Sequence, residues 1–112
     1  MKYKFGDVYL VKFHPAMGQE LHKYRPAVIL SDKTNEIDSR FVTIAPFTTK
    51  ISKSKNFEIL FKTSEVPFLD KNSLLLLWYI RTTEIDSLEV KLGEISDIKK
   101  KELKNNLVKL FS

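Results

Sequence analysis

Residues 24–31 read YRPAVILS, and this segment predicts the central strand of a β-sheet. Ala27 to Leu30 form an unbroken apolar run with the length and β-branched content of a strand buried on both faces. Pro26 stands at the predicted start of the strand, where a missing backbone N–H removes least from the hydrogen-bond ladder. The same proline holds Arg25 in an extended conformation.

Arg25 is the first candidate functional residue, because it projects from the rigid edge of this strand. Its guanidinium offers five N–H donors in a planar fork, a geometry that suits a phosphate group. The alternative is an ordinary surface arginine in a salt bridge, which contributes little to stability. The residues that accompany Arg25 in the sequence are needed to choose between a phosphate-binding arginine and a surface arginine.

The composition bounds what the chain can be. With 112 residues, 43% of them apolar, residues 1–112 have the size and core content of a single domain. Cysteine is absent and His14 and His22 are the two histidines, so we expect no disulfide, no metal centre and no cofactor. The net charge of +5 favours a polyanionic partner. Without a run of about 18 apolar residues or a signal-peptide centre, the sequence predicts a cytoplasmic protein with no membrane span.

Short predicted strands surround the central one. They cover residues 8–13, 40–47, 57–61, 73–80 and 88–95. The run at 73–80 is apolar throughout, so we expect it to be buried on both faces, inside the domain or across a subunit contact. Residues 14–23 and 31–39 lack periodicity and predict loops, the first of them long enough to be functional.

A change of apolar period marks the C-terminal segment as a helix. Leu103, Leu107, Leu110 and Phe111 follow one another at helical spacing, and Ser96 or Asp97 is the predicted N-cap. Several short strands followed by one terminal helix predict a small, mostly antiparallel β-barrel of the α+β class.

A hydroxyl and a group of lysines follow the predicted strand at 40–47. Thr48 either caps a turn or donates its hydroxyl to a phosphate. Lys50, Lys53 and Lys55 come next without an intervening acid. This pattern is typical of a mobile solvated loop, but beside a phosphate site it would also serve as a clamp on a nucleic-acid backbone.

With these residues in order, the chain resembles the MazF/PemK family of toxin endoribonucleases from type II toxin–antitoxin systems. The matching segments are GDVYLV at 6–11, Pro15 with GQE at 18–20, RPAVILS at 25–31, PFT at 46–48, IRT at 80–82, LGEIS at 92–96 and the closing helix. Their order and spacing cover nearly the whole chain.

The resemblance implies an SH3-like barrel shared with the gyrase poison CcdB, a homodimer, and metal-independent cleavage of single-stranded RNA at short sequences. It also implies inhibition by a cognate antitoxin whose tail occupies the substrate groove. The family's catalytic arginine and threonine fall on Arg25 and Thr48. Leu76 and Trp78 stand where the PemK branch has a charged Arg-x-Asp pair, and Gln19 replaces a histidine of that branch, so a MazF-type site is the better match.

Metal-free RNA cleavage needs a base for the 2′-hydroxyl proton, donors for the phosphoryl oxygens and a proton for the leaving 5′-oxygen. Arg25 suits charge stabilisation and proton delivery, because its pKa is too high for a base. Glu20 and His22 are the candidates for the base. The alternatives are that Glu20 orients Arg25 and that His22 is an exposed loop histidine.

RNA recognition requires aromatic faces for unstacked bases and cations for the backbone. Tyr24, Phe47 and Tyr79 are the aromatic candidates, each with a core or dimer-contact role as its alternative. The cationic candidates are Lys23, Lys50, Lys53, Lys55 and Arg81.

A non-catalytic module on the same fold is the competing hypothesis. Such a module would bind nucleic acid or poison a protein target as CcdB does. CcdB-like poisoning would be expected to act through C-terminal residues. We expect the apolar end of this chain, residues 110–112, to be packed, which disfavours poisoning.

Overall fold

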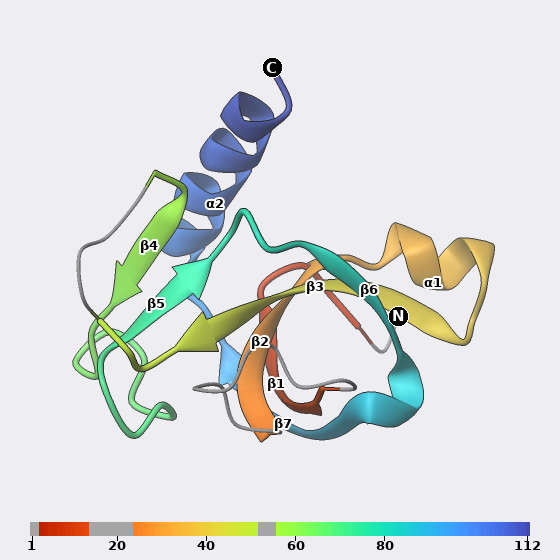
Figure 1. Cartoon of the computed structure of the whole chain (residues 1–112), viewed down its shortest axis with the longest axis horizontal. Coiled ribbons are helices and arrows are strands. Elements are labelled where there is room, and N and C mark those ends of the chain that lie inside the picture. The colour runs from red at the N-terminus through yellow and green to blue at the C-terminus, as the bar shows by residue number, and fades with distance from the viewer. Residues whose placement is uncertain (1–2, 14–23, 52–55) are drawn as a thin grey trace.

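The computed structural model describes residues 3–13, 24–51 and 56–112 and contains one antiparallel sheet and a C-terminal helix (Figure 1). The strands are β1 Asp7–Lys12, β2 Tyr24–Ser31, β3 Phe41–Thr48, β4 Glu58–Phe61, β5 Ser73–Leu76, β6 Arg81–Glu84 and β7 Leu88–Glu94. The helices are α1 Lys33–Ile37, a 3-10 turn at Ile85–Ser87 and α2 Asp97–Leu110. No helix in these described ranges is long and apolar enough to cross a membrane.

The strand β2 lies inside the sheet, as its apolar run predicts. The strand order is β4-β5-β3-β2-β1-β7, and β6 pairs with β3 beside this path. One long edge of β3 is therefore shared, with β6 on residues 41–44 and β5 on residues 47–48. The predicted antiparallel architecture with a terminal helix is confirmed. The sheet is not closed into a barrel, because the described parts of β4 and β7 stand at its two ends and do not pair with each other.

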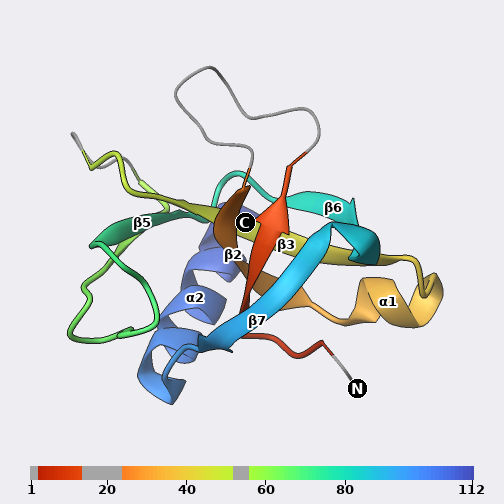
Figure 2. The ribbon, with the colours of Figure 1, turned by 90° about the horizontal axis from the view of Figure 1, so that it is seen from below.

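Alternation along the central strands divides the core into two clusters, one on each face of the sheet. Val28 of β2 and Ala45 of β3 belong to the first cluster, which also includes Leu103 of α2. Ile29 and Ile44 belong to the second, on the opposite face. Because side chains alternate between faces with a period of two, one continuous apolar run supplies both clusters. Figure 2 shows α2 against one side of the sheet.

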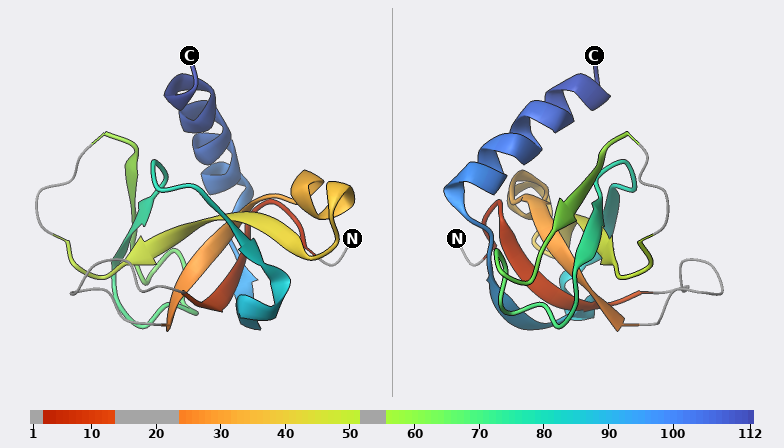
Figure 3. Two further views of the ribbon diagram at one scale, coloured as in Figure 1. Left: turned by 45° about the vertical axis from the view of Figure 1, so that its right-hand side comes forward. Right: turned by 90° about the vertical axis from the view of Figure 1, so that its left-hand side faces the viewer.

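Helix α2 begins at its predicted N-cap, and its C-terminal end extends beyond the part that packs against the sheet. Ser96 is extended, and its side-chain oxygen accepts a hydrogen bond from the backbone N–H of Lys99 at 3.2 Å. Leu103 is fully buried, whereas Phe111 is 75% exposed. The C-terminal end of α2 projects away from the sheet (Figure 3). The expectation of a packed C-terminal end is therefore wrong, because the sheet ends before the last turn of the helix does.

Replacing Ser96 by alanine should lower the free energy of unfolding by about 1 kcal/mol, the usual cost of losing an N-cap. The reason is that the N–H of Lys99 loses its acceptor. Urea denaturation followed by circular dichroism measures the change. Ser96→Asp keeps an acceptor and should retain most of the stability. Equal losses in both variants would contradict a capping role.

Two predicted segments differ from the structure. Residues 31–39, expected to be a loop, contain α1. The apolar run at 73–80 is a strand only to Leu76, after which the chain turns, with the N–H of Tyr79 bonded to the carbonyl of Leu76. Trp78 in this turn is 45% exposed. Burial of the whole run inside the domain is therefore wrong, although residues 74–77 are buried within this one chain. Burial of the remainder across a subunit contact stays a prediction.

Candidate active site

Strand pairing brings together the ends of β2 and β3 that carry Arg25 and Thr48. Strands β2 and β3 pair antiparallel, with Ala27 opposite Pro46 and Val28 opposite Ala45. Continuing this register by two residues sets Arg25 opposite Thr48. Directly opposite residues of an antiparallel pair project from the same face of the sheet. The two residues proposed to act together therefore share one face, at the end of the β2–β3 pair.

The side chain of Arg25 is buried and held by the backbone of β3. Only 6% of the residue is exposed, and its Nη1 donates a hydrogen bond to the carbonyl oxygen of Phe47 at 2.9 Å. Its Nε has no hydrogen-bond partner within the described part of the chain. A buried donor without a partner is costly, so the group is set up to receive an acceptor.

The charge of Arg25 survives this burial. Desolvation lowers the pKa of the guanidinium from its ordinary value. Arginine titrates so far above neutral pH that the side chain stays cationic. The burial of Arg25 argues against the interpretation as an ordinary surface arginine. A buried and still cationic side chain makes Arg25 a candidate for binding an anionic ligand.

A small hollow opens at Arg25. Its volume is about 100 Å³, and it is lined by Tyr24, Arg25, Pro26, Phe47, Thr49 and Ser73. Thr48 lies next to this lining, and its Oγ1 accepts a hydrogen bond from the backbone N–H of Lys50 at 3.2 Å. This bond is the predicted turn-capping contact, and the hydroxyl proton can still be donated. The two interpretations of Thr48 are thus compatible.

Thr49 and Ser73 are site residues that the sequence analysis missed. Thr49 directly follows Thr48, so its proximity could have been inferred from the strand end alone. Ser73 comes from β5, which is far along the chain and reaches the site only because β5 pairs with the last residues of β3. No sequence signal at Ser73 indicates that pairing.

The aromatic candidates lie in three different environments. Tyr24 is 45% exposed at the rim of the hollow, with Nζ of Lys12 5.8 Å from its ring centroid. Phe47 is a core residue whose ring packs edge-on against Phe61, so its assignment as a stacking platform for RNA is corrected. It contributes its carbonyl to the site instead. Tyr79 packs at the border of the second core cluster.

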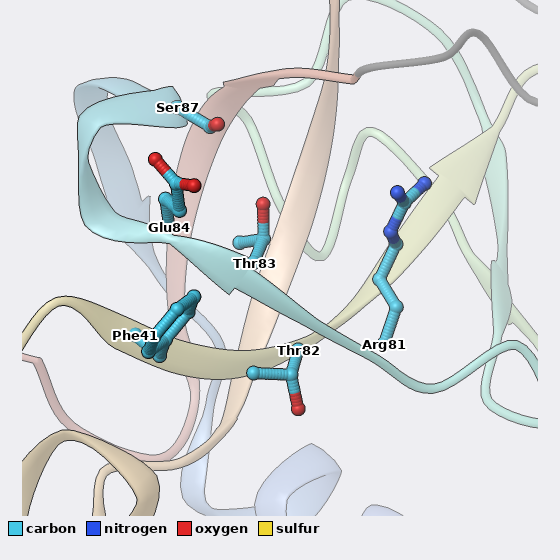
Figure 4. Close-up of a pocket in the computed structure, with 6 residues that line it drawn as sticks. All are labelled: Phe41, Arg81, Thr82, Thr83, Glu84 and Ser87. Atoms are coloured by element: carbon cyan, nitrogen blue, oxygen red, sulfur yellow. The ribbon is translucent and has the colours of Figure 1, made fainter. Parts of the chain in front are cut away.

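Arg81 lies on the same face as Thr48 but in a separate hollow. It pairs with Ile44, four residues before Thr48 on β3. Its guanidinium lies 5.3 Å from the ring centroid of Phe13. Arg81 borders a hollow of about 270 Å³ with Phe41, Thr82, Thr83, Glu84 and Ser87, and Figure 4 shows its side chain extending away from Glu84. The structure thus does not bring Arg81 to the Arg25 hollow.

Several candidates lie outside the described residues. These are Glu20, His22, Lys23, Lys53 and Lys55. Lys50, the remaining cation, is exposed and directly follows Thr49, which lines the hollow. Within the described ranges no group of three or more histidines or carboxylates could hold a metal ion.

The open antiparallel sheet, the terminal helix and the buried arginine at a strand end define a class of small α+β proteins with a candidate anion site. Residues 4–111 match the family model described as PemK-like, MazF-like toxin of type II toxin-antitoxin system. A curated relative, Endoribonuclease MazF of Staphylococcus saprophyticus, is 39% identical over 101 residues, covering 89% of this chain and 83% of the relative. The chain belongs to this MazF-like toxin family, which confirms the resemblance.

Solved structures share the fold of this chain. MazF (Form-I) from Deinococcus radiodurans superposes with a TM-score of 0.74 at 22% identity, covering 96% of this chain and 94% of that chain. The Mycobacterium tuberculosis toxin MazF-mt6 gives 0.73 at 18% identity, covering 94% and 95%. An endoribonuclease in complex with its cognate antitoxin from a mycobacterial species gives 0.67 at 18%, covering 99% and 95%.

Proposed function

We propose that this toxin is a metal-independent endoribonuclease that cleaves single-stranded RNA at short sequences in the cytoplasm. The observation that carries the proposal is the Arg25 guanidinium, buried, cationic and fixed to the Phe47 carbonyl, with its Nε unpartnered in the described part of the chain. A phosphoryl group is the ligand that such a fork binds best. The name of the S. saprophyticus relative supports RNA as the substrate.

The reaction follows from what RNA itself supplies. The 2′-oxygen attacks the adjacent phosphorus, the bond from phosphorus to the 5′-oxygen breaks, and a 2′,3′-cyclic phosphate remains. Arg25 stabilises the charge on the phosphoryl oxygens, and Thr48 donates its hydroxyl to the same group. The 2′-hydroxyl proton passes to a base, for which Glu20 and His22 are the candidates, and the leaving 5′-oxygen takes up a proton.

Regulation and assembly are part of the same proposal. We infer that a cognate antitoxin covers the substrate groove and that the toxin is a homodimer. A complex with an antitoxin among the structural neighbours supports the first inference. The apolar run at 74–77 no longer supports the second, because these residues are buried within one chain.

Cleavage in the presence of a chelator tests the proposal. The wild-type protein and a mixed-sequence single-stranded RNA are incubated with excess EDTA, and the product ends are identified by mass spectrometry. We expect cleavage that leaves 5′-hydroxyl and 2′,3′-cyclic phosphate ends. A 2′-deoxy nucleotide at the cut position should block it. Absence of cleavage would favour the non-catalytic module. Because Phe111 is exposed, the argument from a packed C-terminal end against CcdB-like poisoning no longer holds.

Removing the hydroxyl of Thr48 should slow cleavage at least about tenfold, because a hydrogen bond to a charged group contributes about 1.5–3 kcal/mol. Thr48→Val keeps the shape of the side chain, and Thr48→Ser keeps the hydroxyl. Single-turnover cleavage rates at saturating protein measure the difference. Recovery in Thr48→Ser but not in Thr48→Val is expected. Equal rates in all three proteins would remove Thr48 from the chemistry.

A further inference from the structure

Trp78, the one tryptophan of the chain, is held at the surface by a hydrogen bond. It lies in the turn between β5 and β6 and is 45% exposed. Its Nε1 donates to Oε2 of Glu58 at 2.8 Å, and its ring centroid is 5.4 Å from that of Tyr79. A large ring that is exposed yet anchored at its polar end is pre-organised for a ligand, because little side-chain freedom remains to be lost on binding.

The anchor of Trp78 lies on the same sheet face as Arg25 and Thr48. Thr48 pairs with Leu74 on β5, and Leu74 pairs with Leu60 on β4. Glu58 pairs with Leu76. It lies two residues before Leu60 on β4, and Leu76 lies two residues after Leu74 on β5. Since alternate residues share a face, Glu58, Leu60 and Thr48 project from one side. Two strand spacings and two residues of strand rise place Glu58 about 12 Å from Thr48.

We propose that Trp78 is a stacking platform for one base of the single-stranded RNA, a short distance along the strand from the phosphate held by Arg25. Glu58 is the positioning residue that fixes the indole. This inference rests on the proposed function and adds a substrate subsite to it. Stacking accepts any base, so the platform sets affinity and register rather than sequence.

Intrinsic fluorescence tests the proposal directly, because Trp78 is the source of tryptophan emission in the chain. The wild-type protein is titrated with a 2′-fluoro oligonucleotide of the cleaved sequence, which lacks the attacking hydroxyl. We expect quenching that saturates with binding. Loss of one base from the oligonucleotide, made as an abasic series, should weaken binding by the wild type at one position and leave Trp78→Ala unaffected there.

Variants separate the ring from its anchor. Trp78→Ala should weaken oligonucleotide binding roughly 5- to 150-fold, and Trp78→Phe should restore most of it. Glu58→Ala should lower the anisotropy of Trp78 emission and weaken binding, whereas Glu58→Gln, which retains an acceptor oxygen, should behave as wild type. The matched control is Phe111→Ala, an exposed aromatic at the far end of α2, which should bind unchanged.

The outcomes distinguish this inference from the proposed function. Cleavage and binding by the wild type, without quenching and with unchanged affinity in Trp78→Ala, would overturn the inference and leave the nuclease intact. Neither cleavage nor binding by the wild type would overturn both. Unchanged RNA affinity with weakened self-association in Trp78→Ala, measured by sedimentation, would make the ring a protein contact and also overturn the inference.

Discussion

Arg25→Ala should cleave RNA at least about a hundredfold more slowly than the wild type, with its fold intact. The expected loss follows from the cost of removing one preorganised donor from the developing charge of a transition state. In this chain the donor is fixed at one end by the Phe47 carbonyl at 2.9 Å and is shielded from water. Single-turnover rates in chelator, at protein concentrations that saturate the RNA, measure the chemical step.

Two control variants show whether the loss of cleavage rate in Arg25→Ala is specific to this guanidinium. Arg40→Ala removes an exposed arginine that is paired with Asp38 at 2.7 Å, and it should leave the rate unchanged. Arg25→Lys keeps the charge but loses the planar fork, so it should recover only part of the rate. Circular dichroism and thermal melting have to show a folded protein in each case. Equal cleavage by Arg25→Ala and the wild type would remove Arg25 from the mechanism.

Phe61→Ala should lower the free energy of unfolding by about 3–5 kcal/mol, the usual cost of deleting a buried aromatic ring. Phe61 is fully buried and packs edge-on against Phe47, with their ring centroids 5.2 Å apart. Lys99 of α2 also lies over the Phe61 ring, with Nζ 4.7 Å from the ring centroid. The substitution therefore loosens β4, α2 and the strand that carries the Arg25 acceptor. Urea denaturation measures the loss.

Phe111→Ala is the matched control for Phe61→Ala, because it deletes the same side chain at an exposed position. We expect its effect to stay within about 0.5 kcal/mol, as for surface substitutions away from special contacts. A loss below about 1 kcal/mol in Phe61→Ala would show that the two sheet faces pack independently of this ring. A large loss in Phe111→Ala would show that another molecule covers the end of α2.

Local patterns predicted the parts of the fold that depend on neighbouring residues. The unbroken apolar run at 27–30 identified a strand buried on both faces, because a period of two sends successive side chains to opposite sides of the sheet. Ser96 identified the start of α2, because its hydroxyl accepts a nearby backbone N–H. The run at 73–80 was misleading, because apolar character alone does not show where a strand ends and a turn begins.

What the chain alone determined is the strand that carries Arg25 and the cationic character of that residue. The predicted start of the strand at Pro26 is wrong, because pairing with β1 extends β2 back to Tyr24. The tertiary structure decided which groups meet there. Pairing of β2 with β3 brings Phe47 and Thr48 to Arg25, and pairing of β5 with the end of β3 adds Ser73. These contacts join residues more than 20 positions apart. They depend on which strand edges pair once the chain has collapsed, and no local pattern encodes that choice.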